Sequence, residues 1–295
     1  MRSLVLGGTG MLGRALVREL RRRGWAALGL AHAQADVTDR RRLLYWAHAF
    51  QPEALFNCAA FTRVDDCESD PERALAVNGA AVGNAVAAAD SVGAQLLQVS
   101  TDYVFAGTAS APYATSAPTA PASAYGRSKL EGERQAAPYA RSAIVRTSWL
   151  FGPGGPNFVR TIAGLLGRTE APLRVVDDQR GCPTYTPFLA RALADLAATQ
   201  ARGVFHYRNR DDVTWYGFAV EIARELGSPA EILPVTTAEF PRPAARPAYS
   251  VLDVSSFEAI AGRRVEPWIS GLSEYLSAPE LQKVPSSSAQ HKGRL

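Results

Sequence analysis

The chain has 295 residues, of which 47% are hydrophobic and 20% charged, which suits one large α/β domain or two closely packed ones. The net charge of +4 comes from arginines spread over predicted helix faces, and no basic stripe is interleaved with aromatic residues, which argues against nucleic-acid binding. Three cysteines without a C-x-x-C spacing and four unclustered histidines argue against disulfides or a zinc site and fit a reducing cytoplasm.

The first predicted elements are a strand, a glycine-rich turn and a helix. The apolar run at residues 3–6 is too short for a signal peptide, and no run approaches the ~20 apolar residues of a membrane span. A helix is predicted at 14–23. Gly7, Gly10 and Gly13 follow the dinucleotide-binding pattern of a tight turn, backbone approach to a pyrophosphate and close helix packing. A purely structural turn is the alternative.

The second predicted strand, residues 26–30, ends without an acidic residue. An acid at this point binds the ribose hydroxyl of NADH, whereas its absence leaves room for the 2′-phosphate of NADPH. His32 lies at the strand end and the next acid is Asp36. We therefore favour NADPH, with NADH as the alternative. Asp36 either contacts the adenine or caps the following helix.

Two more strands, predicted at 54–57 and 95–100, each end in residues suited to a site. The small residues at 58–60 allow either a cofactor or a helix to approach closely. An Ala-rich helix is predicted at 68–90, between the two strands. Thr101 follows the second strand, at the sheet edge where doubly wound proteins bind ligands.

The segment at 123–131 contains a Tyr-x-x-x-Lys pair. On a helix, Tyr125 and Lys129 lie one turn apart on the same face. The ammonium stabilises the phenolate and lowers a tyrosine pKa of about 10, so the pair can give a proton to a carbonyl oxygen while hydride reaches the carbon. Thr101 can donate a second hydrogen bond to that oxygen. Such pairs also occur by chance, so this interpretation depends on a nucleotide site elsewhere.

The remaining pattern completes the predicted architecture. Further strands are predicted at 143–147, 173–176 and 203–207, and further helices at 158–166, 187–200 and 215–226. The fold class is therefore α/β, a Rossmann-type doubly wound parallel sheet with a smaller C-terminal substrate-binding domain. The predicted domains are an NAD(P)-binding domain at 1–150 with later returns near 173–207, a mainly substrate-binding domain at 151–277, and a disordered tail at 278–295.

Several motifs together resemble the dTDP-4-dehydrorhamnose reductase family, within the extended short-chain dehydrogenase/reductase superfamily. They are Gly7-x-x-Gly10-x-x-Gly13, residues 57–65, residues 100–105, Tyr125-x-x-x-Lys129-x-x-x-Glu133, residues 146–149, residues 178–184 and Arg246-Pro247. The resemblance covers about residues 3–276. It implies NAD(P)H-dependent reduction of the C4 ketone of a nucleotide-linked 4-keto-6-deoxy sugar, dTDP-4-dehydro-L-rhamnose or a related deoxysugar, by a cytoplasmic enzyme.

The resemblance also implies roles for individual residues. Tyr125 is the proton donor, Lys129 lowers its pKa and holds the nicotinamide ribose, and Thr101 aids the proton step. The implied cofactor-binding residues are Gly7, Thr9, Gly10, Met11, Leu12, Gly13, Asp36, Val37, Ala59, Ala60, Thr62, Thr101, Tyr125 and Lys129. The implied substrate-binding residues are Thr101, Asp102, Tyr103, Trp149 and Arg246, with Arg246 at the diphosphate.

The sequence departs from the family at one point. Some members carry a glutamate after the glycine motif that helps to bind Mg²⁺ between subunits, whereas this chain has Arg14-Ala15. The family resemblance allows Mg²⁺, but this departure argues against it, so we assign no metal ligands and predict either a monomer or a homodimer. A sugar-nucleotide epimerase and a non-catalytic NADP-binding regulatory subunit stay as alternatives. A dehydratase is disfavoured because Tyr103, not glutamate, follows Asp102.

Overall fold

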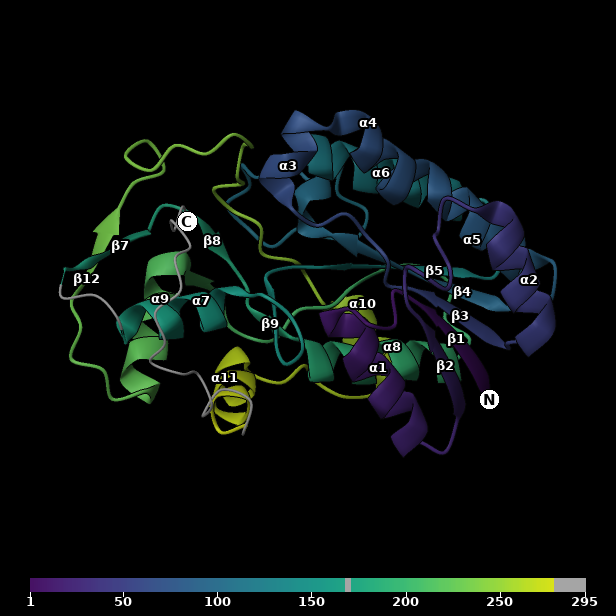
Figure 1. The fold of residues 1–295 in the computed structure, drawn as a ribbon. Coiled ribbons are helices and arrows are strands. Elements are labelled where there is room, and N and C mark those ends of the chain that lie inside the picture. Colours follow the sequence, from purple (N-terminus) through teal and green to yellow (C-terminus); the bar gives the residue numbers. More distant parts are fainter. Residues whose placement is uncertain (168–170, 279–295) are drawn as a thin grey trace.

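A six-stranded parallel sheet forms the centre of the protein in a computed structural model that describes residues 1–167 and 171–278 (Figure 1). In spatial order its strands are β10 (Gly203–His206), β5 (Ser142–Thr147), β4 (Gln95–Thr101), β3 (Ala54–Asn57), β1 (Arg2–Leu6) and β2 (Ala26–Leu30). The strand order reverses between β1 and β3, which is the point where doubly wound sheets bind ligands. The predicted Rossmann-type fold is confirmed. Apart from residue 278, the predicted tail lies outside the described residues.

Helices cover both faces of the sheet (Figure 1). One face carries α2 (Arg40–Phe50), α5 (Ala81–Asp90) and α6 (Ala124–Ala136), and the other carries α1 (Met11–Arg22), α8 (Thr186–Ala198) and α10 (Ser255–Ala261). The protein has an apolar cluster on each face of the sheet. Successive side chains of β3 point to opposite faces, so Leu55 packs in one cluster and Phe56 in the other. All positions of β4 and β5 are buried, as expected for parallel strands covered on both faces.

The register of the sheet brings the ends of β1 and β3 together. Leu6 pairs with Asn57, so the chain that leaves each strand starts at the same edge. Between β3 and β4, the predicted single helix is broken into α3 (Val64–Ser69), α4 (Pro71–Ala74) and a π-helical turn, η1 (Leu75–Ala80), that continues into α5. Asp70 explains the break, because its side chain caps α4 by accepting from the Arg73 amide at 3.0 Å.

The rest of the chain forms small two-stranded sheets and short helices. The strand pairs are β7 (Leu173–Val176) with β12 (Ile232–Val235), β8 (Arg180–Gly181) with β11 (Val213–Thr214), and β6 (Leu150–Phe151) with β9 (Thr184–Tyr185). The other helices are η2 (Asp102–Val104), α7 (Phe158–Leu166), α9 (Trp215–Glu225) and α11 (Trp268–Leu276). β10 returns to the main sheet, whereas β7 and β12 lie at the far end of the molecule (Figure 1). The domain boundaries stay a prediction.

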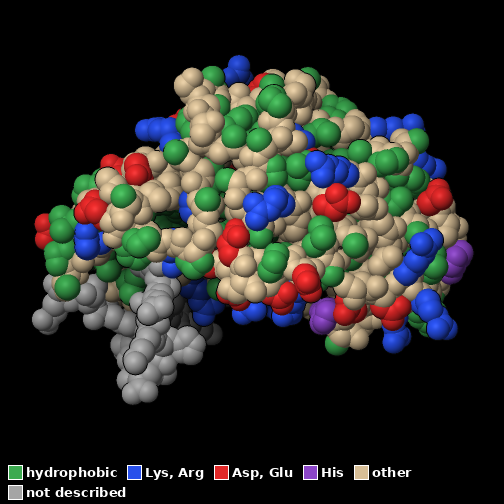
Figure 2. Space-filling view, turned by 90° about the horizontal axis from the view of Figure 1, so that it is seen from above, with side chains coloured by type: hydrophobic (Ala, Val, Ile, Leu, Met, Phe, Trp, Pro, Cys, Tyr) green, Lys and Arg blue, Asp and Glu red, His purple; other side chains and the backbone are tan. Residues whose placement is uncertain are grey.

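The surface gives no sign of a single charged stripe on the face shown in Figure 2, where basic, acidic and apolar side chains are intermixed. Among the residues described, no helix has both the length and the apolar character needed to span a membrane.

Candidate active site

The glycine-rich turn after β1 has the tight packing that its spacing predicts. Gly7 has a φ of +70°, and a methyl group on it would lie 2.8 Å from the Ala59 amide nitrogen. A methyl group on Gly13 would overlap the Gly7 carbonyl oxygen. By contrast, the only neighbour of a methyl group on Gly10 would be the Gly7 oxygen at 3.3 Å. Gly7 and Gly13 therefore permit the turn itself, and Gly10 leaves the open approach that a pyrophosphate requires.

The turn leads directly into the N-terminus of α1. Gly10 is the N-cap residue, it provides no side-chain cap, and the first turn holds no acid. The positive end of the helix dipole is thus free to attract an anion. Thr9 is exposed and Met11 partly exposed beside it, whereas the Leu12 side chain lies in the core. Leu12 therefore has only its backbone to offer to a cofactor.

Gly8 and Gly29 form a contact that sequence analysis missed. A methyl group on Gly8 would lie 2.5 Å from the Gly29 α-carbon of β2. The two glycines let the turn pack directly on the neighbouring strand. In the sequence, the second glycine of the Gly7-Gly8 pair indicates that the backbone is approached closely at this point. The sequence does not show that the approaching residue is Gly29, 21 positions later, because the register between β1 and β2 brings the two together.

The region after β2 corrects one prediction for Asp36. Its carboxylate accepts hydrogen bonds from the Thr38 amide at 2.9 Å and hydroxyl at 2.8 Å, and these bonds lower its pKa. The N-cap of α2 is Asp39, which accepts from the Arg42 amide at 3.0 Å, so the capping role expected for Asp36 is wrong. Val37 is buried beside it. An adenine contact for Asp36 and Val37 stays a prediction.

A buried asparagine links the loop after β3 to α6, the helix that carries Tyr125 and Lys129. Asn78 lies on the π-helical turn η1 and is 1% exposed. Its side chain accepts from the Phe61 amide at 2.8 Å and donates to the Phe61 carbonyl and the Ser128 hydroxyl, each at 3.0 Å. π-Helical turns often occur at functional sites. Sequence analysis did not identify Asn78, although a polar residue inside an Ala-rich helix was visible.

The same loop carries the small residues predicted to contact the cofactor. Ala59 and Ala60 are partly exposed and Thr62 is exposed. Ala59 faces Gly7 of the first turn. The loop and the glycine turn therefore border the same space at the switch point of the sheet, which fits a dinucleotide.

Tyr125 and Lys129 both lie on α6, where Ser123 caps the helix by accepting from the Gly126 amide at 3.1 Å. Lys129 is 4% exposed, and its ammonium donates to the Val99 carbonyl at 2.6 Å. Burial lowers the pKa of Lys129 to about 8, although nearby Glu133 opposes this shift.

The pKa of Tyr125 is raised, not lowered as predicted. The cause is burial first and the neighbouring Asp102 second, and a hydrogen bond with Thr101 opposes them. The ammonium of Lys129 has no such influence here, because it is directed at the Val99 carbonyl. Tyr125 thus keeps its proton at neutral pH, as a proton donor must.

The residues after β4 converge on this tyrosine. The Thr101 hydroxyl donates to Asp102 at 2.9 Å and accepts from the Tyr103 amide at 3.2 Å. The Tyr103 ring stands edge-on to Tyr125 with ring centroids 5.6 Å apart. Asp102 is 2% exposed, and burial raises its pKa to about 6. Its Oδ2 has no well-aligned partner among the described residues, although the Ser250 hydroxyl is near enough to lower the pKa.

A cavity of about 180 Å³ opens beside Tyr103. Its lining combines aromatic rings with guanidinium groups: Phe158, Trp215, Phe240, Arg174, Arg242 and Arg246 are among the residues. Arg246 donates to Asp65 at 2.9 Å, so the predicted loop arginine is held in place. Trp215, Phe240 and Arg174 were not predicted, because only the tertiary fold brings these separate segments together.

Trp149 lies behind this cavity rather than on its lining. Its ring stacks on Trp215 with centroids 3.5 Å apart and planes 7° from parallel. A methyl group on Gly181 would lie 2.5 Å from the Trp149 ring. The φ of Trp149 is +45°, a conformation that costs about 1–3 kcal/mol for a residue other than glycine and is common at functional sites. Direct contact of Trp149 with a sugar stays a prediction.

The residues present do not fit Mg²⁺. The position after the glycine motif carries Arg14 and Ala15, and Arg14 is exposed. Within residues 1–167 and 171–278 there is no group of three or more His, Cys, Asp or Glu side chains able to hold a metal ion.

Comparison with known proteins identifies the family. Residues 1–280 match the family model described as RmlD substrate binding domain. The chain is 42% identical over 285 residues to the dTDP-4-dehydrorhamnose reductase of Streptomyces griseus, covering 94% of this chain and 93% of that protein. This chain belongs to the dTDP-4-dehydrorhamnose reductase family.

Two further relatives of this reductase family carry names that describe a ligand or a reaction. A probable dTDP-4,6-dihydroxy-2-methyloxan-3-one 4-ketoreductase of Streptomyces antibioticus is 40% identical, covering 93% of this chain and 94% of its own length. The solved dTDP-4-dehydrorhamnose reductase of Bacillus anthracis str. Ames, in complex with NADP, superposes with a TM-score of 0.89 at 33% identity, covering 93% of this chain and 98% of that one.

Proposed function

We propose that this enzyme reduces the C4 ketone of a dTDP-linked 4-keto-6-deoxy sugar, with NADPH as the hydride donor. One observation carries the proposal. At the carboxyl edge of the sheet, Tyr125 is hydrogen-bonded with Thr101 at the end of β4, and Lys129 of the same helix reaches the Val99 carbonyl of that strand. The Tyr103 ring beside Tyr125 lines the arginine-lined cavity. Family membership and the NADP complex of a relative support the same reading.

The cofactor site is assigned to the switch point of the sheet. We assign the pyrophosphate to the Gly7–Gly13 turn and the N-terminus of α1, and the nicotinamide ribose to Lys129, whose ammonium bonds the Val99 carbonyl in this structure. The end of β2 carries His32 and no acid, which favours the 2′-phosphate of NADPH over NADH. When bound, the reduced nicotinamide supplies the hydride.

Tyr125 supplies the proton that completes the reduction. Its raised pKa keeps the phenol protonated until negative charge develops on the substrate oxygen, which then takes the proton. We assign Thr101 to the same oxygen; its hydroxyl donates to Asp102 in this structure and must turn to donate to the substrate. Lys129 has a pKa of about 8 and is therefore mostly charged at neutral pH. We assign its ammonium to the phenolate left behind, which requires it to turn from the Val99 carbonyl that it bonds in this structure.

The dTDP portion is assigned to the cavity beside Tyr103. Arg242 and Arg246 suit the diphosphate because guanidinium groups bind phosphate oxygens in pairs, and the rings of Trp215 and Phe240 suit a thymine base. The principal candidate substrate is dTDP-4-dehydro-L-rhamnose. A related dTDP-deoxysugar is the second candidate, because the Streptomyces antibioticus relative is named a 4-ketoreductase of another dTDP sugar.

The direct test is NADPH oxidation with dTDP-4-dehydro-L-rhamnose generated in the assay, run in parallel with NADH. The proposal expects substrate-dependent oxidation with a preference for NADPH. A folded, NADP⁺-binding protein that oxidises neither cofactor with any dTDP-4-keto sugar would overturn it.

The free thiols of Cys58, Cys67 and Cys182 support a cytoplasmic location.

A further inference from the structure

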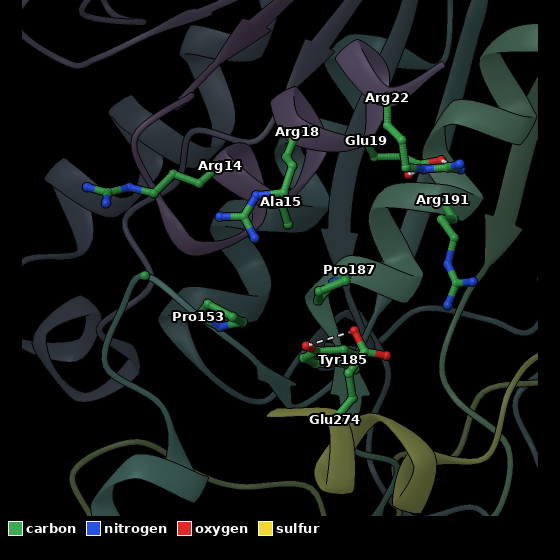
Figure 3. A pocket seen from close by; sticks show the side chains of 11 residues that line it. Arg14, Ala15, Arg18, Glu19, Arg22, Pro153, Tyr185, Pro187, Arg191 and Glu274 are labelled. Carbon is green, nitrogen blue, oxygen red and sulfur yellow. Dashed lines mark hydrogen bonds and ion pairs between the residues drawn. The ribbon is translucent and has the colours of Figure 1, made fainter. Parts of the chain in front are cut away.

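A second, larger cavity lies on the opposite side of the sheet from the catalytic helix (Figure 3). It measures about 450 Å³ and opens where α1, α8, α11 and the loop at 153–154 meet. Because α6 covers the other face of the sheet, none of the proposed catalytic residues borders this cavity. The proposed reduction gives it no role.

The cavity wall formed by α1 is strongly basic. Arg14, Arg18 and Arg22 are spaced four residues apart, so they share one helix face. Of these three arginines, only Arg22 has a carboxylate partner on the described chain, Glu19 at 2.7 Å. Arg23, which does not line the cavity, binds the same carboxylate. Glu19 is therefore already neutralised, and its lowered pKa keeps it ionised in this pair.

Arg14 and Arg18 are left without a carboxylate partner on the described chain. Arg14 donates to the Thr9 carbonyl at 2.6 Å, and both side chains are exposed. Like charges four residues apart destabilise a helix, and a cation near the helix N-terminus also opposes the dipole. An anion placed between these guanidinium groups would relieve both costs.

The facing wall adds a fourth arginine. Arg191 of α8 lines the cavity and lies 3.4 Å from Glu266 outside it. The acid on this side is Glu274 of α11, which accepts from the Tyr185 hydroxyl at 3.3 Å (Figure 3). Among the lining residues, four arginines against the carboxylates of Glu19 and Glu274 leave a net charge of +2, part of which Glu266 offsets at Arg191 from outside the cavity.

We propose that this cavity binds a small multivalent phosphate anion of the pyrophosphate class. Arg14 and Arg18 are its principal ligands, and Arg191 of α8 lines the same cavity while remaining close to Glu266. Guanidinium groups pair with phosphate oxygens through two parallel hydrogen bonds, which fits this cluster better than a single monovalent ion. A divalent cation would meet net positive charge, and of the two lining carboxylates Glu19 is already paired with arginines, which leaves Glu274.

The test is calorimetric titration of the NADP⁺-saturated protein with pyrophosphate, and separately with MgCl₂. We expect pyrophosphate to bind and Mg²⁺ not to bind. Replacing both ligands in Arg14→Gln/Arg18→Gln should weaken pyrophosphate binding roughly tenfold or more, because each charge-assisted hydrogen bond contributes about 1.5–3 kcal/mol. Arg21→Gln is the matched control on the same helix, since Arg21 bonds the Ala27 carbonyl away from the cavity.

The Arg246→Gln variant distinguishes pyrophosphate binding in this cavity from pyrophosphate binding in the proposed substrate site. Pyrophosphate binding that disappears in Arg246→Gln but survives in the double α1 variant would overturn the proposal, as would binding of Mg²⁺ in place of pyrophosphate. Thermal denaturation of each variant without ligand shows that it is folded. If the double variant does not fold, Arg18→Gln alone should still weaken pyrophosphate binding, while Arg18→Lys should restore part of it.

Discussion

The buried ion pair between Glu133 and Arg146 lies directly behind Lys129. The Glu133 carboxylate accepts from Arg146 at 2.8 and 2.7 Å and from Ser100 at 2.6 Å, and both charged side chains are 6% exposed. Glu133→Gln leaves the Arg146 charge buried without compensation, which costs about 3–5 kcal/mol. Because a domain has only ~5–15 kcal/mol of stability in total, urea denaturation should show a large drop in the midpoint.

The same substitution should change the pH dependence of reduction. The Glu133 carboxylate raises the pKa of Lys129, so replacing it with glutamine should lower that pKa below about 8. Lys129 then loses its proton at a lower pH. Activity should therefore decline at lower pH in Glu133→Gln than in the unmodified enzyme. Glu131→Gln on the same helix is the matched control. Its pair with Arg134 spans 3.6 Å at the surface and contributes about 0–1 kcal/mol. Equal stability of the two variants would refute the reasoning.

Three further predictions concern the cofactor turn, the buried acid and the substrate cavity. Gly13→Ala should abolish NADP⁺ binding in an equilibrium titration, because the methyl group overlaps the Gly7 oxygen, whereas Gly164→Ala, with open space around it, should bind normally. The pKa of Asp102 is about 6 in the folded protein against 3.8 for an unperturbed aspartate, so ionising the buried carboxyl lowers the free energy of unfolding as pH rises through this window. Asp102→Asn removes this loss, and its free energy of unfolding relative to the unmodified protein should increase by up to about 3 kcal/mol as pH rises from 3.8 to 6. A difference in urea midpoints that does not change with pH contradicts this. Arg246→Gln should weaken dTDP binding by about tenfold or more, unlike the surface variant Arg210→Gln.

Local sequence rules predicted the parts of the site that local geometry controls. Gly7 and Gly13 have the packing that their spacing predicts, because the turn between a parallel strand and its helix has few solutions. The Tyr125 and Lys129 pair needed only helical periodicity. Asp36 shows the limit of such rules, since two aspartates preceded the same helix and only the structure shows that Asp39 is the cap.

The remaining features depend on contacts between distant segments. The stack of Trp149 on Trp215 joins residues 66 positions apart, and Gly181 leaves the room for it. The raised pKa of Tyr125 depends on burial, which a Tyr-x-x-x-Lys pattern does not report. Asn78 contacts Phe61 because a π-helical turn reorients it, and an Ala-rich sequence gives little indication of that turn.

The central claim is that Tyr125 gives the proton in an NADPH-dependent ketone reduction. It is tested most directly by NADPH oxidation with dTDP-4-dehydro-L-rhamnose in Tyr125→Phe, alongside NADP⁺ binding. Tyr139→Phe is the control, because the Tyr139 hydroxyl bonds the Ala94 carbonyl outside the site. We predict a loss of about 10²–10⁴-fold in turnover for Tyr125→Phe with NADP⁺ binding unchanged, and near-normal turnover for the control. Near-normal turnover in Tyr125→Phe would contradict the account.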